Sequence, residues 1–236
     1  MLLDNPDFNY GQGMRIHVRT KIQRWWSYIE SAAVQIGADI FEVKSGIQDR
    51  QYWYNGKNVT NFENGRESLV SHHLPFTVGG FDVRYRVKSD HVIQYKIFLP
   101  DKQVLVLRSV KEWLHVELDY SEAKDFSSSV GLMGTFGEGV LAGRDGTVYE
   151  DLNAFGQEWQ VHSDEPQLFH FTDGPQHPDK CLMPDESTSA TRRYLKANTI
   201  TRADAKKACG NVNKGDFNNC VFDVMAMDDI QMADGY

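Results

Sequence analysis

The feature that most constrains this sequence is the strict alternation of apolar and charged residues in segment 81–88. Phe81, Val83, Tyr85 and Val87 would share one side of an extended chain, and every residue between them is charged. A period of two is the period of a strand with one buried face. Antiparallel sheets commonly have one such wet face. The segment therefore predicts an antiparallel sheet whose apolar side packs on a core.

The same period recurs on both sides of this segment. Residues 14–20 alternate apolar and basic side chains, and in 112–119 the alternation places His115, Glu117 and Asp119 outward. Further strands are expected at 40–44, 51–54, 91–98 and 103–107, with Asn55-Gly56 as a hairpin turn and Pro100-Asp101-Lys102 as a second turn. Eight or more short strands at this spacing are typical of a sandwich or a barrel. A parallel α/β fold is not expected, since no helix long enough for a crossover separates these strands.

Composition narrows the class of protein. The chain has 236 residues, of which 41% are hydrophobic and 25% charged, the range of a soluble globular protein. A formal net charge of −8 argues against a nucleic-acid partner, because phosphate binding calls for a basic face. No apolar run approaches the roughly twenty residues that span a bilayer.

Two motifs close this strand-rich part. The first, Gly131-Leu132-Met133-Gly134-Thr135-Phe136, indicates a strand that leaves through a tight turn with little room for side chains. The second, Phe155-Gly156-Gln157-Glu158-Trp159-Gln160-Val161, is expected to be one more strand, with Trp159 and Val161 on one face. A loop of roughly twenty residues separates them, which is long enough to suggest a function.

These motifs resemble the closing segment of the von Willebrand factor type D domain, and the resemblance covers about residues 10–161. The residues that carry it are Gly131, Leu132, Met133, Gly134, Phe136, Phe155 and Trp159. It implies an antiparallel β-sandwich in which 21–36 is strand, although the apolar spacing there also fits a helix. It further implies that the family's opening strands lie upstream of Met1, so that the chain is a trimmed piece of a secreted protein. The alternative is a cytosolic protein without a signal peptide.

Type D domains often hold a calcium ion in the loop after the glycine motif, so the resemblance raises the question of a calcium site. Here Met133 replaces the family's cysteine and Thr135 its asparagine. Glu138, Asp145 and Asp151 remain as candidate calcium ligands, because calcium takes six to eight oxygen ligands. The alternative is a loop fixed by turn hydrogen bonds. No other cofactor is expected.

The composition changes after the second motif. We expect a β-sandwich over 1–161, a proline-marked connector over 162–188 and a small helical region over 189–236. Helices are predicted near 192–197, after a capping box at Thr201, and at 220–227. The predicted fold class is thus mostly β, an antiparallel β-sandwich with a small C-terminal α-helical appendage.

The chain has three cysteines, an odd number for a secreted domain. Cys209 and Cys220 are close enough in sequence for a local disulfide that would staple two short helices. Cys181 is left over and would pair with a cysteine upstream of the chain. Three buried thiols are the alternative.

The sequence predicts a non-enzymatic protein. It contains no Gly-x-Ser-x-Gly motif, no phosphate-binding loop and no histidine or cysteine pair at metal-ligand spacing. An enzyme would need a pocket that joins His, Asp or Glu residues scattered along the chain. The resemblance instead implies an extracellular or cell-surface structural, adhesive or assembly module whose partners are other protein domains.

Two surface features bear on this role. Asn58 begins the sequon Asn58-Val59-Thr60 and is a candidate glycosylation site. The alternative function, a carbohydrate-binding β-sandwich, would need two or three exposed, coplanar aromatic side chains. The candidates for that platform are Trp25, Trp26, Trp53, Tyr52 and Tyr54, whose alternative place is the sheet core.

Overall fold

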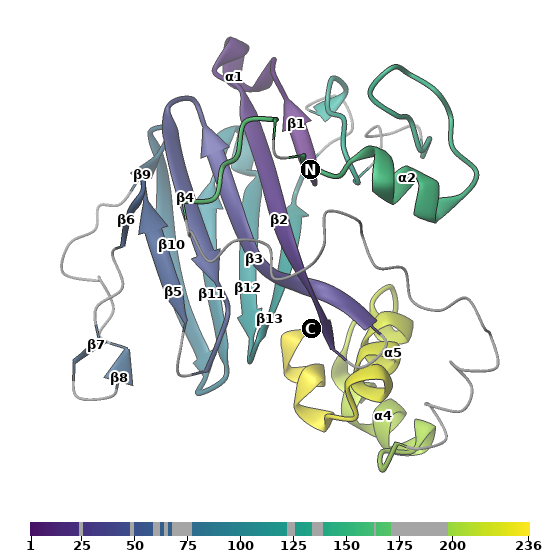
Figure 1. The fold of residues 1–236 in the computed structure, drawn as a ribbon. Coiled ribbons are helices and arrows are strands. Elements are labelled where there is room, and N and C mark those ends of the chain that lie inside the picture. Colours follow the sequence, from purple (N-terminus) through teal and green to yellow (C-terminus); the bar gives the residue numbers. More distant parts are fainter. Residues whose placement is uncertain are drawn as a thin grey trace.

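The chain folds into two antiparallel sheets packed face to face, with a small helical region at one end (Figure 1). The computed structural model describes residues 1–23, 26–47, 50–58, 62–63, 66–67, 77–121, 126–133, 139–162, 164–170 and 198–236. Strand content exceeds helix content in this part of the chain, and the predicted β-sandwich with a helical appendage is confirmed.

Both sheets follow the order of the chain, so that each strand pairs with the next. The six-stranded sheet contains β1 (Leu3–Asn5), β2 (Met14–Gln23), β3 (Trp26–Ile36), β4 (Asp39–Lys44), β5 (Gln51–Tyr54) and β6 (Lys57–Asn58). The five-stranded sheet contains β9 (Thr77–Val78), β10 (Phe81–Ser89), β11 (Val92–Phe98), β12 (Val104–Val110) and β13 (Trp113–Asp119). A separate two-stranded pair consists of β7 (Phe62–Glu63) and β8 (Arg66–Glu67).

Helices in the described part are short, and none is long and apolar enough to cross a membrane. The α-helices are α1 (Phe8–Gly11), α2 (Leu152–Glu158), α4 (Arg202–Ala208) and α5 (Phe217–Met227). The 3-10 helices are η2 (Pro100–Lys102), η4 (Cys209–Asn211) and η5 (Ile230–Gly235). The capping box predicted at Thr201 is present, since its hydroxyl accepts from the backbone N–H of Asp204 and the Asp204 carboxylate accepts in return. The helix expected near 192–197 lies outside the described residues.

The core between the sheets is built from the apolar side of the alternating segments. Leu114 is buried, and Val116 and Leu118 pack against the same cluster, as the alternation in 112–119 predicts. Val87 departs from its predicted place and is 52% exposed. The reason is a register shift between Val87 and Ser89, which disturbs the inward–outward alternation at that end of β10.

Two other predictions for this part are confirmed. Residues 21–36 lie in strands β2 and β3 and not in a helix, apart from the two undescribed residues between these strands. Asn55 and Gly56 connect β5 to β6 with φ of 47° and 75°. A type I′ hairpin turn requires positive φ at both central residues.

The strand predicted for 155–161 is wrong. Residues 152–158 form helix α2, which begins at Asp151, whose carboxylate accepts hydrogen bonds from the backbone N–H groups of Asn153 and Ala154. Phe155 and Trp159 are both buried. Their spacing of four residues suits one face of a helix as well as period two suits a strand. The N-capping aspartate is the local signal that decides for the helix.

The first glycine of the motif has little room for a side chain, as predicted, but the strand expected there is wrong for the described residues, because Val130 forms a single bridge and 131–133 are bend and turn residues. Val130 exchanges backbone hydrogen bonds with Asp4, and Met133 N–H donates to the Leu2 carbonyl oxygen at 3.1 Å. Gly131 has φ of 130°, and a Cβ atom there would lie 2.5 Å from the same Leu2 oxygen. This segment therefore pairs with the outer edge of β1, and that close approach leaves no room for a side chain at residue 131.

Gly131→Ala is expected to lower the free energy of unfolding by about 1–3 kcal/mol, because the new methyl group meets backbone that cannot yield without breaking this pairing. The matched control is Gly156→Ala in α2, where a Cβ meets nothing within 4 Å. A helix interior favours alanine over glycine, so the control is expected to gain about 0.5–1 kcal/mol. Urea denaturation of both variants measures the difference, and equal stabilities would contradict this assignment.

The C-terminal helices pack on one end of the five-stranded sheet. Val92, Val110 and Trp113 from the sheet form a second apolar cluster with residues of α4, η4, α5 and η5. Cys209 and Cys220 are joined by a disulfide, with their Cα atoms 6.0 Å apart, as predicted. Polar contacts between the helical region and the sheet side reinforce the packing. Among them are Lys111 with Asp229, His91 with Asp234, and Arg108 with the Gly235 carbonyl oxygen. Figure 1 places this region at the end of the sandwich opposite α1 and α2.

Candidate functional site

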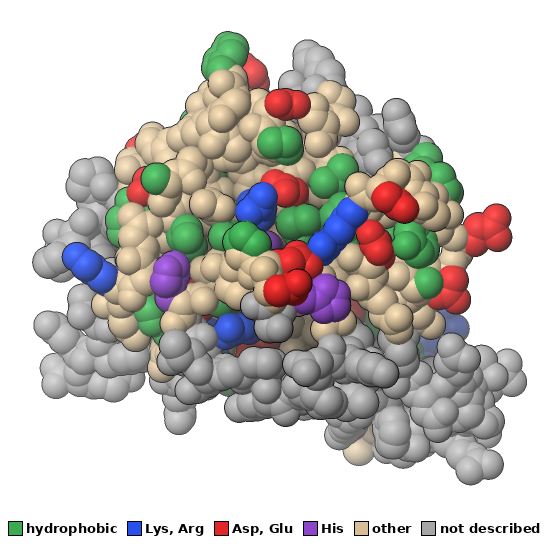
Figure 2. Space-filling model, turned by 45° about the horizontal axis from the view of Figure 1, so that its top comes forward, with side chains coloured by type: hydrophobic (Ala, Val, Ile, Leu, Met, Phe, Trp, Pro, Cys, Tyr) green, Lys and Arg blue, Asp and Glu red, His purple; other side chains and the backbone are tan. Residues whose placement is uncertain are grey.

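The loop between the two sequence motifs is held by one arginine. The Arg144 side chain donates to the Glu165 carboxylate at 2.7 Å and to the Gln160 carbonyl oxygen at 3.0 Å. Its backbone N–H donates to Glu158, and its guanidinium lies 5.4 Å from the Trp159 ring centre. Figure 2 brings this end of the molecule forward and shows acidic and basic side chains side by side among scattered hydrophobic ones. The described part of the loop, from residue 139 on, is thus fixed by internal contacts.

Two of the three candidate calcium ligands have local structural roles. The Asp145 carboxylate accepts hydrogen bonds from the backbone N–H and from the side chain of Thr147, and these bonds lower the pKa of the exposed Asp145 carboxyl. Asp151 caps α2. Glu138, like Gly134 and Phe136 of the motif, lies outside the described residues. Within the part of the chain that the structure describes, no three His, Cys, Asp or Glu side chains are grouped as metal ligands. Calcium binding stays a prediction.

The structure places part of the proposed aromatic platform in the interior. Tyr52 is 3% and Trp53 is 7% exposed, so neither presents a ring to solvent. The side chains of Trp25 and Trp26 lie outside the described residues. Asn58 is exposed at the end of β6, which suits a glycosylation site, and the rest of its sequon lies beyond the described residues.

A basic strip runs along the outer face of β10 and β11. We define the basic strip as Arg84, Arg86, Lys88 and Lys96. The three residues on β10 are exposed, and Lys96 is partly buried. Val83, Tyr85, Tyr95 and Ile97, the residues that alternate with them, belong to the core or pack against it. This face therefore carries four cations, although the net charge of the chain is −8.

The register of the strands places like charges against each other in this strip. Arg84 is directly opposite Lys96, and like charges in that position destabilise a sheet. Partial burial and then the positive charges of Arg108 and Arg86 lower the pKa of Lys88. Three interactions offset part of this repulsion: Asp82 lies 3.9 Å from Arg84, the Phe98 ring centre lies 4.6 Å from the Arg84 guanidinium, and the negative charge of Glu117 favours charged Lys88. The remaining repulsion between Arg84 and Lys96 costs stability in the free protein. We interpret that cost as a sign that this surface binds a partner.

Within the described residues, β10 also has an open edge. Its only other strand partner in the described part is β9, which pairs with Phe81 and Asp82 alone. Along Val83–Ser89 no described strand lies beyond β10, so its outer backbone groups face away from the sheet. A strand edge of this kind can accept an extended segment of another chain.

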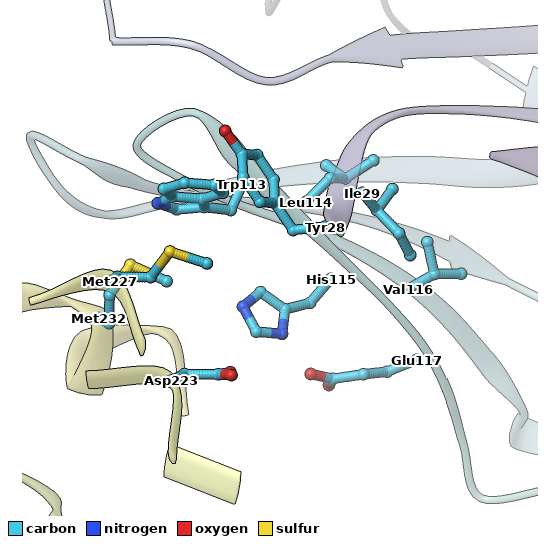
Figure 3. A pocket seen from close by; sticks show the side chains of 10 residues that line it. All are labelled: Tyr28, Ile29, Trp113, Leu114, His115, Val116, Glu117, Asp223, Met227 and Met232. Carbon is cyan, nitrogen blue, oxygen red and sulfur yellow. The ribbon is translucent and has the colours of Figure 1, made fainter. Parts of the chain in front are cut away.

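A cavity of about 290 Å³ lies where the C-terminal helices meet β13 and β3. Its walls are mainly apolar and aromatic, and three ionisable side chains reach into it. Figure 3 shows the carboxyl groups of Glu117 and Asp223 pointing toward each other from β13 and α5, with the His115 ring above the gap. The lining residues are Tyr28, Ile29, Trp113, Leu114, His115, Val116, Glu117, Asp223, Met227 and Met232.

Burial changes the acid–base properties of these three groups. Burial and then the positive charge of Arg108 lower the pKa of His115 to about 4. Burial raises the pKa of Glu117 against the opposing effect of Arg108, and it raises the pKa of Asp223 against a hydrogen bond from Tyr236. At neutral pH the imidazole is therefore uncharged, and it can accept a hydrogen bond.

Each carboxyl group uses one oxygen in a structural contact. Glu117 accepts from Arg108 at 2.6 Å, and Asp223 accepts from the Tyr236 hydroxyl at 2.5 Å. The Tyr236 ring packs edge-on against His115, with ring centres 5.6 Å apart. Among the described residues, no contact is seen for the second oxygen of either carboxyl group.

Sequence reasoning found two of these three residues without recognising the cavity. The alternation in 112–119 places His115 and Glu117 on the outer face, where the structure has them. Asp223 comes from a helix more than a hundred residues later, and no local pattern reports which strand that helix will cover. Comparison of the sequence with protein-family models gave no match, and comparison with curated protein sequences gave none. The type D resemblance therefore depends on the motif residues alone.

Proposed function

We propose that this chain is a non-enzymatic extracellular interaction module that binds acidic segments of partner proteins. The basic strip is the observation that carries the proposal, because it combines repelling cations with the open edge of β10. The negative charges of an acidic partner would offset the repulsion between Arg84 and Lys96, and this relief would add to the binding free energy. The strand edge would supply backbone hydrogen bonds to an extended segment, and the strip would select its charge.

The chemistry of the cavity supports a binding role over catalysis. The described residues that line the cavity include no serine, threonine or cysteine that could act as a nucleophile. Each carboxyl group has a structural contact, Glu117 with Arg108 within the sheet and Asp223 with Tyr236 within the helical region. The type D resemblance supports the same class of function, although α2 stands where that family has a strand.

The disulfide supports an extracellular location. Disulfides form and persist in oxidising compartments and are rare in the cytosol. Cys209 and Cys220 are both fully buried. The exposed sequon asparagine, Asn58, agrees with a secretory route.

A charge-reversal experiment tests the proposal. The variant Arg84→Glu/Arg86→Glu/Lys96→Glu is expected to bind fluorescent poly-L-glutamate at least tenfold more weakly than the wild type at about 50 mM salt, because it turns the attraction into repulsion. Fluorescence anisotropy gives the dissociation constants. Because Arg84→Glu and Lys96→Glu face each other, one like-charge pair replaces another, and the variant is expected to unfold within a few degrees of the wild type.

The control carries the same change in net charge on other faces. It is Lys57→Glu/Lys102→Glu/Lys214→Glu, three exposed lysines from β6, η2 and the helical region. Equal losses in the two triple variants would overturn the proposal, because binding would then depend on net charge alone. A parallel titration with heparin separates the sources of charge: tighter, strip-dependent binding of heparin would assign the strip to sulfated polysaccharides instead.

A further inference from the structure

We propose that the cavity between β13 and the C-terminal helices binds a small organic cation, an ammonium group carried on an apolar or aromatic body. It takes in residues from two regions of the fold, and ligand sites occur preferentially at such junctions. Its volume of about 290 Å³ suits a ligand about the size of an arylalkylamine. This inference does not rest on the proposed binding of acidic segments, although Lys88 of the basic strip also acts on Glu117.

The walls select an apolar body. Trp113 and Tyr28 contribute aromatic rings, and Met227 and Met232 contribute thioethers from the opposite side (Figure 3). Aromatic faces attract cations through their quadrupole, and methionine adapts its shape to irregular ligands. A wholly polar ligand would gain nothing from this lining.

The floor selects a positive charge. The second oxygens of Glu117 and Asp223 accept no hydrogen bond among the described residues, and the two carboxyl groups point toward each other across the gap (Figure 3). An ammonium group has three donors and no acceptor. It can donate to both carboxylates and to an uncharged His115 at the same time, whereas an anion would meet two negative charges.

The nearby cations leave this selection in place. Arg108 approaches the cavity from β12, where its guanidinium pairs with Glu117 and also donates to the Gly235 carbonyl oxygen. Lys88 contributes a smaller favourable effect on Glu117, which Asp119 and Asp216 oppose. Counting these groups with Asp223 gives four carboxyl groups and two cations around the cavity, so the local balance remains negative.

Binding is tested with matched probes of one shape. 2-Phenylethylamine is expected to raise the melting temperature of the whole chain, because a ligand of the native state stabilises it. Its neutral isostere 2-phenylethanol is expected to bind at least tenfold more weakly, and 3-phenylpropionate not at all. Calorimetric titration at neutral pH gives the affinities. Equal binding of the amine and the alcohol, or no binding of the amine, would overturn the inference.

Variants locate the site. Glu117→Gln and Asp223→Asn are each expected to weaken amine binding at least tenfold, while Asp101→Asn, an exposed carboxyl in η2 outside the cavity lining, changes it less than twofold. Trp113→Phe is expected to remove the ligand-induced change in tryptophan fluorescence. If a carboxyl variant is less stable, the change in Trp113 fluorescence on adding the amine to the wild-type protein still shows whether the amine binds in the cavity. Unaltered affinity in both carboxyl variants would place the amine elsewhere.

Discussion

Removing the Cys209–Cys220 disulfide is expected to lower the free energy of unfolding of the C-terminal region by about 3 kcal/mol. The bond closes a loop with a sequence separation of 11, for which the loss of chain entropy in the unfolded state corresponds to about 3 kcal/mol. The helices that it joins have 7 and 11 residues. Helices of that length are marginally stable in isolation. Both the disulfide and the apolar cluster around Trp113 therefore stabilise them.

The double variant Cys209→Ala/Cys220→Ala measures this contribution by urea denaturation, with Cys181→Ala as the control that keeps the bond. The double variant is expected to lose the C-terminal helices at lower urea than the sheets. The double variant is also expected to bind 2-phenylethylamine more weakly, because Asp223 and Met227, which line the cavity, lie in the disulfide-linked helix α5. A double variant within about 0.5 kcal/mol of the control would show that the sheet contacts alone position the helices.

Acidification from pH 7 to pH 5 is expected to destabilise the fold by up to about 4 kcal/mol through two histidines. Burial first, and then neighbouring positive charges, lower the pKa of His17 to about 4, and burial with Arg108 does the same for His115. The unfolded chain has histidine pKa values near 6.5, so between about pH 6.5 and pH 4 it binds more protons than the native state. Stability therefore falls as the pH drops through this window, by about 2 kcal/mol per histidine at pH 5.

The raised pKa values of Glu117 and Asp223 act in the opposite direction. Their protonation is easier in the native state than in the unfolded chain, so they offset part of the loss as the pH falls. Urea denaturation at a series of pH values measures the net slope. His17→Gln and His115→Gln are each expected to flatten it, and wild-type slopes in both variants would contradict the assignment to these residues.

The strands were predictable because their information is local. Alternation in 81–88 and 112–119 fixes which side chains face the core, and Asn55-Gly56 fixes a turn, whatever the rest of the chain does. The exception at Val87 comes from a bulge, a feature of pairing between strands that one strand's pattern does not contain. The helix α2 was missed because Phe155 and Trp159 fit both periods, and only the capping role of Asp151 separates the two.

The candidate sites could not be predicted from the sequence, because each joins residues from elements that meet only in the folded protein. The basic strip joins Arg84 to Lys96 through the register of β10 and β11, which the sequence implies only once the hairpin is known. The cavity joins Glu117 to Asp223 through the packing of α5 on β13, which no local pattern specifies. The disulfide was predictable because its two cysteines are near neighbours in sequence.

Hydrogen exchange of the wild-type chain with and without poly-L-glutamate tests the central claim, that the basic strip on β10 and β11 is the binding surface. Peptides that cover Phe81–Phe98 are expected to exchange more slowly when the acidic polymer is present, because it contacts the strip and the open edge of β10. Peptides that cover β4 and β5 are expected to be unchanged. Protection of β4 and β5 without protection of β10 would contradict the account.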